Sequence, residues 1–71
     1  MTRLEAAAAA YRAAVIAAHN AATRSRLTRR DRDATGREIA RANQAALDAR
    51  HALEHALDEL VAAALAHECV S

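Results

Sequence analysis

"SRLTRRDRDATGRE", residues 25–38, is the one stretch of this 71-residue chain that interrupts an otherwise uniform helical pattern. It holds five arginines, two aspartates and the only glycine, and it separates two alanine-rich segments. The chain contains no proline. Because proline and glycine are the residues that disfavour helix most strongly, helix is predicted almost everywhere outside this stretch.

Two capping boxes predict where the helices begin. "TRLE" places Thr2 three residues before Glu5, and "TGRE" places Thr35 three residues before Glu38. In this motif the hydroxyl accepts a hydrogen bond from the backbone N–H three residues on. One helical-hairpin domain over 1–71 is predicted, with helices over about residues 3–26 and 35–67 and an arginine-rich turn over about 27–35. Thr28, with Asp31 as its box partner, is an alternative start for a short additional turn of helix.

Each predicted helix carries one apolar stripe. In the first helix, apolar residues alternate at spacings of four and three, and the stripe stops at Ser25: Leu4, Ala8, Tyr11, Val15, Ala18 and Ala22. In the second, one face collects Ile39, Ala42, Ala46, Leu53, Leu57, Leu60, Val61 and Ala64. Two such helices joined by a polar link predict an all-α antiparallel hairpin. A single uninterrupted helix in a parallel coiled coil is the alternative, which the gap from Ser25 to Arg37 disfavours.

The apolar content is too thin for a chain of this size to be stable alone. Of the 54% apolar residues, twenty-three are alanines, and the larger ones are seven leucines, three valines, two isoleucines, Met1 and Tyr11. We therefore expect a homodimeric four-helix bundle. The predicted hairpin and dimer core comprises Leu4, Tyr11, Val15, Ile39, Leu53, Leu57, Leu60 and Val61. A second contact surface is predicted at Ile16, Leu27, Leu47 and Leu65.

The net charge of +1 hides a strong separation of charge along the chain. Residues 24–41 carry seven of the ten arginines and three acids, a balance of +4, whereas the remaining residues have a balance of −3. The seven are Arg24, Arg26, Arg29, Arg30, Arg32, Arg37 and Arg41. Guanidinium groups in such a cluster predict a tip that binds phosphates or an acidic protein surface, with Arg26, Arg29, Arg30 and Arg32 as the leading residues. The alternative is a solvated turn in which Asp31 and Asp33 neutralise the arginines.

No pattern in the sequence predicts catalysis or a resident cofactor. "HALEH" places His51, Glu54 and His55 at the spacing of one class of zinc peptidase, but a third ligand and a walled cleft are not predicted in a chain this small. Asp48 and His51 match part of a di-iron motif, yet Glu5 is the only acid of the first predicted helix. We therefore expect no enzyme activity, no metal site and no small-molecule substrate.

The cysteine content and hydropathy bear on location. Cys69 is the only cysteine, so no disulfide within the chain is predicted, and a reducing compartment or a disulfide across a dimer fits. The apolar run Ala6–Ala10 is closed by Arg12, so neither a membrane span nor a signal peptide is expected. A cytoplasmic protein is predicted. The excess of alanine and arginine, with no lysine, is also typical of a G+C-rich bacterial or phage genome.

Three functions are compatible with these features. The leading one is a non-enzymatic protein–protein interaction module, a small regulator, adaptor or inhibitor that acts as a hairpin dimer. The second is a nucleic-acid-associated protein that binds phosphates through the arginine-rich tip, although the stretch has no aromatic residue to stack on bases. The third is a structural subunit of a larger helical assembly.

Overall fold

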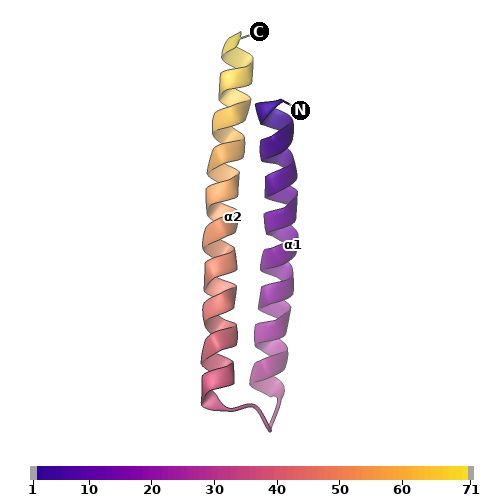
Figure 1. Cartoon of the computed structure of the whole chain (residues 1–71), viewed down its shortest axis with the longest axis vertical. Helices are drawn as coiled ribbons and strands as arrows, with labels where there is room; N and C mark the ends of the chain where they lie inside the picture. The colour runs from indigo at the N-terminus through magenta and orange to yellow at the C-terminus, as the bar shows by residue number, and fades with distance from the viewer. Residues whose placement is uncertain (1, 71) are drawn as a thin grey trace.

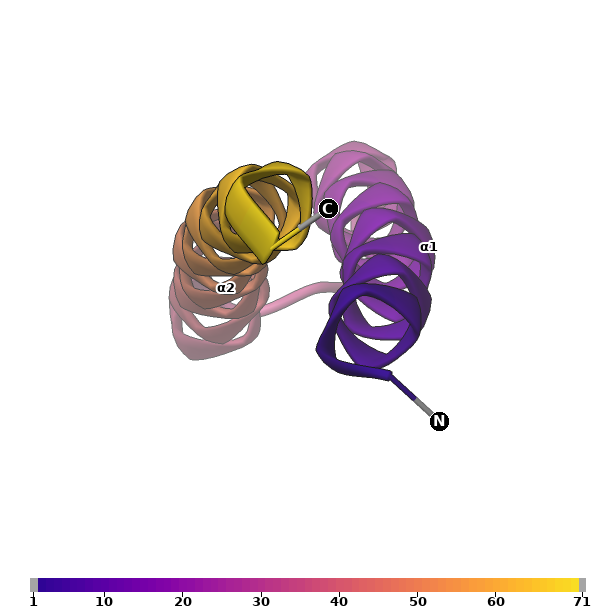
Figure 2. The same cartoon turned by 90° about the horizontal axis from the view of Figure 1, so that it is seen from above.

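The computed structural model describes residues 2–70, which form two long helices packed antiparallel (Figure 1). Helix α1 spans Arg3–Arg30 and helix α2 spans Gly36–Val70. The helices lie side by side along a rod whose Cα atoms extend 56 × 14 × 14 Å, and Figure 2 views this rod from one end. The predicted all-α helical hairpin is confirmed.

Both helices begin at the predicted threonine caps. The Glu5 backbone N–H donates to Thr2 Oγ1 at 3.1 Å, and the Glu38 backbone N–H donates to Thr35 Oγ1 at 3.1 Å. Each bond satisfies one of the backbone donors that the first turn of a helix leaves without a partner. The two local sequence motifs therefore determine where the helices start.

The connection between the helices is shorter than predicted. Helix α1 continues to Arg30, four residues beyond the predicted end, and residues 31–35 connect it to α2. Asp31 ends α1: its backbone N–H donates to the Leu27 and Thr28 carbonyls, while its carboxylate accepts from the Asp33 N–H at 3.0 Å. An aspartate that bonds to the backbone two residues on favours a turn over continued helix.

Thr28 does not begin a helix. It lies inside α1, and its hydroxyl donates to the Arg24 carbonyl one turn earlier at 2.8 Å. The alternative start at Thr28 is therefore wrong. Threonine satisfies its hydroxyl in this way within a continuous helix.

The contact seam between the helices is lined mainly by alanine. In each helix the seam residues alternate at spacings of three and four and are half-buried or buried. In α1 they are Leu4, Ala7, Tyr11, Ala14, Ala18, Ala21, Ser25 and Thr28; in α2 they are Ile39, Ala42, Ala46, Ala49, Leu53, Ala56, Leu60 and Ala63. Ala63, at 2% exposure, is the only buried apolar residue among those described. Alanine at nine of these sixteen seam positions permits a close approach of the two helices.

Three residues predicted for the hairpin and dimer core lie at the rim of the single hairpin. Val15, Leu57 and Val61 are 39%, 44% and 49% exposed. Each follows a seam residue by one position, and two antiparallel helices contact each other along only a narrow stripe. The other predicted core residues lie half-buried in the seam: Leu4, Tyr11, Ile39, Leu53 and Leu60.

The sequence predicted that the seam stops at Ser25, but in the structure the seam includes Ser25 and continues beyond it. Ser25 is 5% exposed, and its hydroxyl donates to Asn43 Oδ1 of the other helix at 2.6 Å. A buried hydroxyl without a partner would be costly, and Asn43 supplies that partner. A polar pair therefore continues the alanine seam toward the turn.

Candidate functional site

The basic tip, residues 24–41, exposes its arginine side chains to solvent. All seven of its arginines are exposed. Within residues 2–68, no carboxylate lies within ion-pairing distance of any of these guanidinium groups. An ion pair between Arg50 Nε and Glu54 Oε1, at 3.9 Å, lies outside the tip. The tip thus keeps its charge of +4 available to a partner.

The two aspartates of the turn lower the net charge of the tip, but they form no direct ion pair with its arginines. The Asp31 carboxylate accepts the Asp33 N–H and holds the turn. Asp33 precedes α2, so it does not lie one helical turn before Arg37.

Four arginines were favoured by the sequence as binding residues, and the local structure describes the position of each. Arg29 and Arg30 lie in the last turn of α1, where a cation offsets the negative end of the helix dipole. Arg26 donates to Thr23 Oγ1 at 3.3 Å. Arg32 lies in the connecting loop, away from both helices. Of these four, only Arg29 lines a groove.

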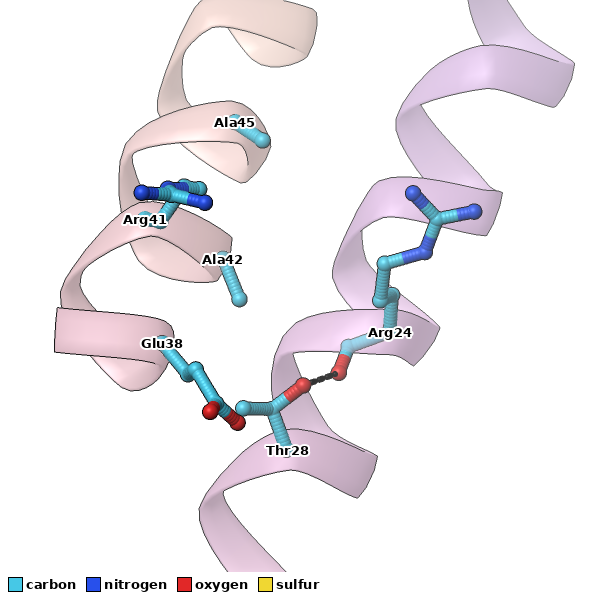
Figure 3. Close-up of a pocket in the computed structure, with 6 residues that line it drawn as sticks. All are labelled: Arg24, Thr28, Glu38, Arg41, Ala42 and Ala45. Carbon is cyan, nitrogen blue, oxygen red and sulfur yellow. Dashed lines mark hydrogen bonds between the residues drawn. The ribbon is translucent and has the colours of Figure 1, made fainter. Parts of the chain in front are cut away.

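Two other arginines flank an open groove between the helices, which we call the tip groove. It is lined by Arg24 and Thr28 of α1 and by Glu38, Arg41, Ala42 and Ala45 of α2 (Figure 3). Arg24 and Arg41 lie on opposite sides of the groove at a similar height, whereas Glu38 points toward Thr28 (Figure 3). A guanidinium on either side of the groove can donate to a carboxylate bound above Ala42 and Ala45.

Arg37 occupies an electrostatically unfavourable position. It lies in the first turn of α2, where the helix dipole is positive and a cation is disfavoured. Arg41 lies one turn further along the same helix and adds like-charge repulsion. The helix dipole therefore supplies no stabilising reason for an arginine at position 37.

A second groove lies on the other side of the seam, and we call it the flank groove. Its lining residues are Ala18, Ala22 and Arg29 of α1 and Asn43, Ala46, Leu47 and Arg50 of α2. Arg24 precedes the seam residue Ser25, whereas Arg29 follows the seam residue Thr28, so the two grooves open on opposite flanks.

The residues predicted for a second contact surface are all exposed in the single hairpin. Leu47 lies in the flank groove, but Ile16, Leu27 and Leu65 are 61%, 62% and 58% exposed on the outer faces of the helices. Sequence reasoning placed only Leu47 where a concave surface exists. It missed Asn43, whose spacing of seven residues from Arg50 and fourteen from Leu57 was the available signal.

The histidines lie apart from both grooves. His51 and His55 are exposed on α2, and the described residues contain no group of three or more ligand side chains able to hold a metal ion. The side chain of Cys69, predicted for a disulfide across a dimer, lies outside the described part of the structure.

The chain matches no model of a known protein family, no protein of curated function and no solved structure. Within residues 2–70, neither α1 nor α2 contains an apolar stretch long enough to cross a bilayer.

Proposed function

We propose that this chain is a non-enzymatic protein–protein interaction module, a homodimeric helical hairpin whose basic tip binds an acidic segment of another protein. The observation that carries the proposal is the set of seven exposed arginines with no carboxylate partner at one end of the rod. A guanidinium donates through a planar fork that matches a carboxylate, and such charge-assisted bonds are among the stronger ones. A small regulator, adaptor or inhibitor acts through this kind of contact.

The composition of the tip groove favours a protein partner over nucleic acid. Ala42 and Ala45 give the groove an apolar floor that suits a peptide side chain next to its carboxylate. The tip also has no aromatic residue on which bases stack.

Phosphate binding is the second candidate, since the charge of +4 at the tip attracts any polyanion. On duplex DNA it predicts an affinity that falls with salt at a log–log slope of about −0.9 for each phosphate contacted. A salt-insensitive interaction excludes it. The third candidate, a subunit of a larger helical assembly, rests on the exposed Ile16, Leu27 and Leu65 and predicts oligomers beyond a dimer in light scattering.

The test compares two variants that lose the same charge at different places. Arg24→Ser/Arg41→Ser removes both arginines of the tip groove, and Arg3→Ser/Arg12→Ser removes two arginines outside the tip. Each immobilised protein is exposed to nuclease-treated lysate, and bound proteins are quantified by mass spectrometry. We expect a protein that binds the wild type and the control and that is lost at least tenfold with the tip variant.

Two outcomes contradict the proposal. Equal losses from both variants show that the tip groove has no special part in binding. Retention of nucleic acid alone, in a parallel experiment without nuclease, makes the second candidate the better one.

A further inference from the structure

Four large apolar side chains gather on one side of the hairpin, and we call them the apolar flank: Val15, Leu47, Leu57 and Val61. They are 39–49% exposed, whereas the three large apolar residues on other faces are 58–62% exposed. Leu47 lines the flank groove with Ala22 and Arg50. Val15 precedes Ala22 by seven residues, and Leu57 follows Arg50 by seven. A seven-residue step rotates a helix by only about 20°, so these residues continue the side on which the groove lies.

The chain exposes more surface than a compact monomer of its size. Its accessible area is 5544 Å², whereas a compact protein of 7.6 kDa exposes about 4,300 Å². A compact protein of twice that mass exposes about 7,100 Å², so dimerisation into an ordinary compact shape removes about 2,000 Å² from each copy. The total over both copies, about 4,000 Å², is typical of an obligate homodimer.

The bond between the helices fixes which residues lie at the same height. Ser25 bonds Asn43, and the helices run in opposite directions. Nine residues from this pair along each helix, Ile16 of α1 and Ala52 of α2 therefore lie level with each other, near the middle of the rod.

The flank of α2 is self-complementary about this level. Arg50 and Glu54 lie two residues on either side of Ala52, and Leu47 and Leu57 lie five residues on either side. Consider a two-fold axis that is perpendicular to the rod and crosses the apolar flank at the level of Ala52. It places Arg50 of one copy against Glu54 of the other and Leu47 against Leu57. Such reciprocal contacts are what a two-fold interface requires.

The flank of α1 is self-complementary about the same level. Glu5 and Arg26 both follow a seam residue by one position, so they lie on this flank, and their midpoint falls between Val15 and Ile16. The same two-fold axis therefore places Arg26 of one copy near Glu5 of the other. In the opposite arrangement, with both turns at one end, the two tips of +4 would repel each other.

We propose that a second copy of the chain covers the apolar flank in an antiparallel arrangement, with the two turns at opposite ends of a four-helix bundle. This inference rests on the homodimer of the proposed function. It adds which face the two copies share, how the copies are oriented and which charged residues pair between them. The tip groove opens on the other flank of the seam and stays accessible in this dimer.

The first experiment exchanges charge between two chains. Arg50→Glu gives a chain with two acids at the axis, and Glu54→Arg gives a chain with two arginines there. Each variant alone should self-associate at least tenfold more weakly than the wild type, and an equimolar mixture should recover heterodimers with near wild-type affinity. Asp58→Arg, on the outer face of α2, is the matched control and should leave dimerisation unchanged. Analytical ultracentrifugation gives the affinities, and circular dichroism confirms that each variant remains helical.

The second experiment reads the orientation directly. In a Cys69→Ser background, one chain carries Glu5→Cys and another carries Arg26→Cys. The antiparallel arrangement predicts disulfides between the two different chains after mixing and oxidation, because two copies of position 5 lie about 30 Å apart. A parallel arrangement predicts disulfides between identical chains.

The outcomes separate this inference from the proposed function. A dimer that ignores the charge exchange, or that gives disulfides between identical chains, overturns the inference and leaves tip binding unaffected. A chain that stays monomeric at millimolar concentration overturns both the inference and the homodimer. Loss of tip binding with an intact antiparallel dimer overturns only the tip proposal.

Discussion

The hydrogen bond between Ser25 and Asn43 provides the sharpest test of how the seam is stabilised. The hydroxyl donates at 2.6 Å from a side chain that is 5% exposed. Asn43→Ala removes the acceptor and leaves that hydroxyl buried. The loss of one partner of a buried bond costs about 1–3 kcal/mol. A serine in a helix can turn back to the carbonyl one turn earlier, so we expect a loss toward the lower end of that range.

The reverse change should cost less. Ser25→Ala continues the alanine seam and improves helix propensity, while the half-buried Asn43 remains within reach of water. We expect a change of about 1 kcal/mol or less. The double variant, Ser25→Ala/Asn43→Ala, replaces both polar groups and should be close to the wild type in stability. The coupling between the two positions is then about 1 kcal/mol.

The measurement is a double-mutant cycle from urea and thermal unfolding, followed by circular dichroism at one fixed chain concentration. For a chain of this size, 1 kcal/mol corresponds to a Tm shift of about 4–8 °C. Independent sites add to within about 0.3–0.5 kcal/mol. If the double variant loses the sum of the two single losses within that margin, the hydrogen bond does not stabilise the seam and the reasoning is refuted.

Three further changes test other parts of the fold by the same unfolding assay. Ala63→Leu overfills a position that is 2% exposed and should destabilise the protein by about 1–3 kcal/mol, whereas the exposed Ala62→Leu should change little; equal effects would contradict close packing at the seam. Thr35→Ala removes the cap of α2 and should cost about 1 kcal/mol, which Thr35→Ser should largely restore, and an unchanged Tm for the alanine variant would argue against the cap. Gly36→Ala should stabilise by about 0.5–1 kcal/mol because no atom lies within 4 Å of the added Cβ and φ is not positive; a lower Tm would show that α2 needs glycine at its first position.

The helix starts were predictable because their causes are local. Thr2 and Thr35 each act on a backbone N–H three residues away, and no tertiary contact is needed to identify them. The end of α1 was less predictable. Asp31 stops the helix through a turn of its own side chain, and the arginines that precede it are all compatible with helix.

The register of the seam was the part that the sequence left ambiguous. In the run Ala6–Ala10 every register presents the same methyl group, so only the larger residues distinguish one stripe from another. These favoured a stripe through Val15 and Leu57, which buries more apolar area in a lone hairpin. The structure instead places the neighbouring Ala14 and Ala56 in the seam, because small side chains allow the helices to approach closely.

The candidate site was predictable as a charge cluster but not as a surface. The excess of arginine in residues 24–41 is evident in the sequence. Which arginines share a groove depends on how two helices from different parts of the chain align. That Arg24 and Arg41 line the same groove is therefore evident only from the packed hairpin.

The polar pair also makes the two ends of the hairpin mechanically unequal. At one end a five-residue loop and the Ser25–Asn43 bond hold the helices together, whereas toward the chain termini Leu4 and Ala63 lie together at the seam and no loop joins the helices. Local opening should therefore start at the chain termini and proceed toward the loop. Backbone amides near the termini then exchange with solvent through small fluctuations, while those beside Ser25 and Asn43 require much of the hairpin to separate. The hairpin is therefore held together most firmly at its basic end.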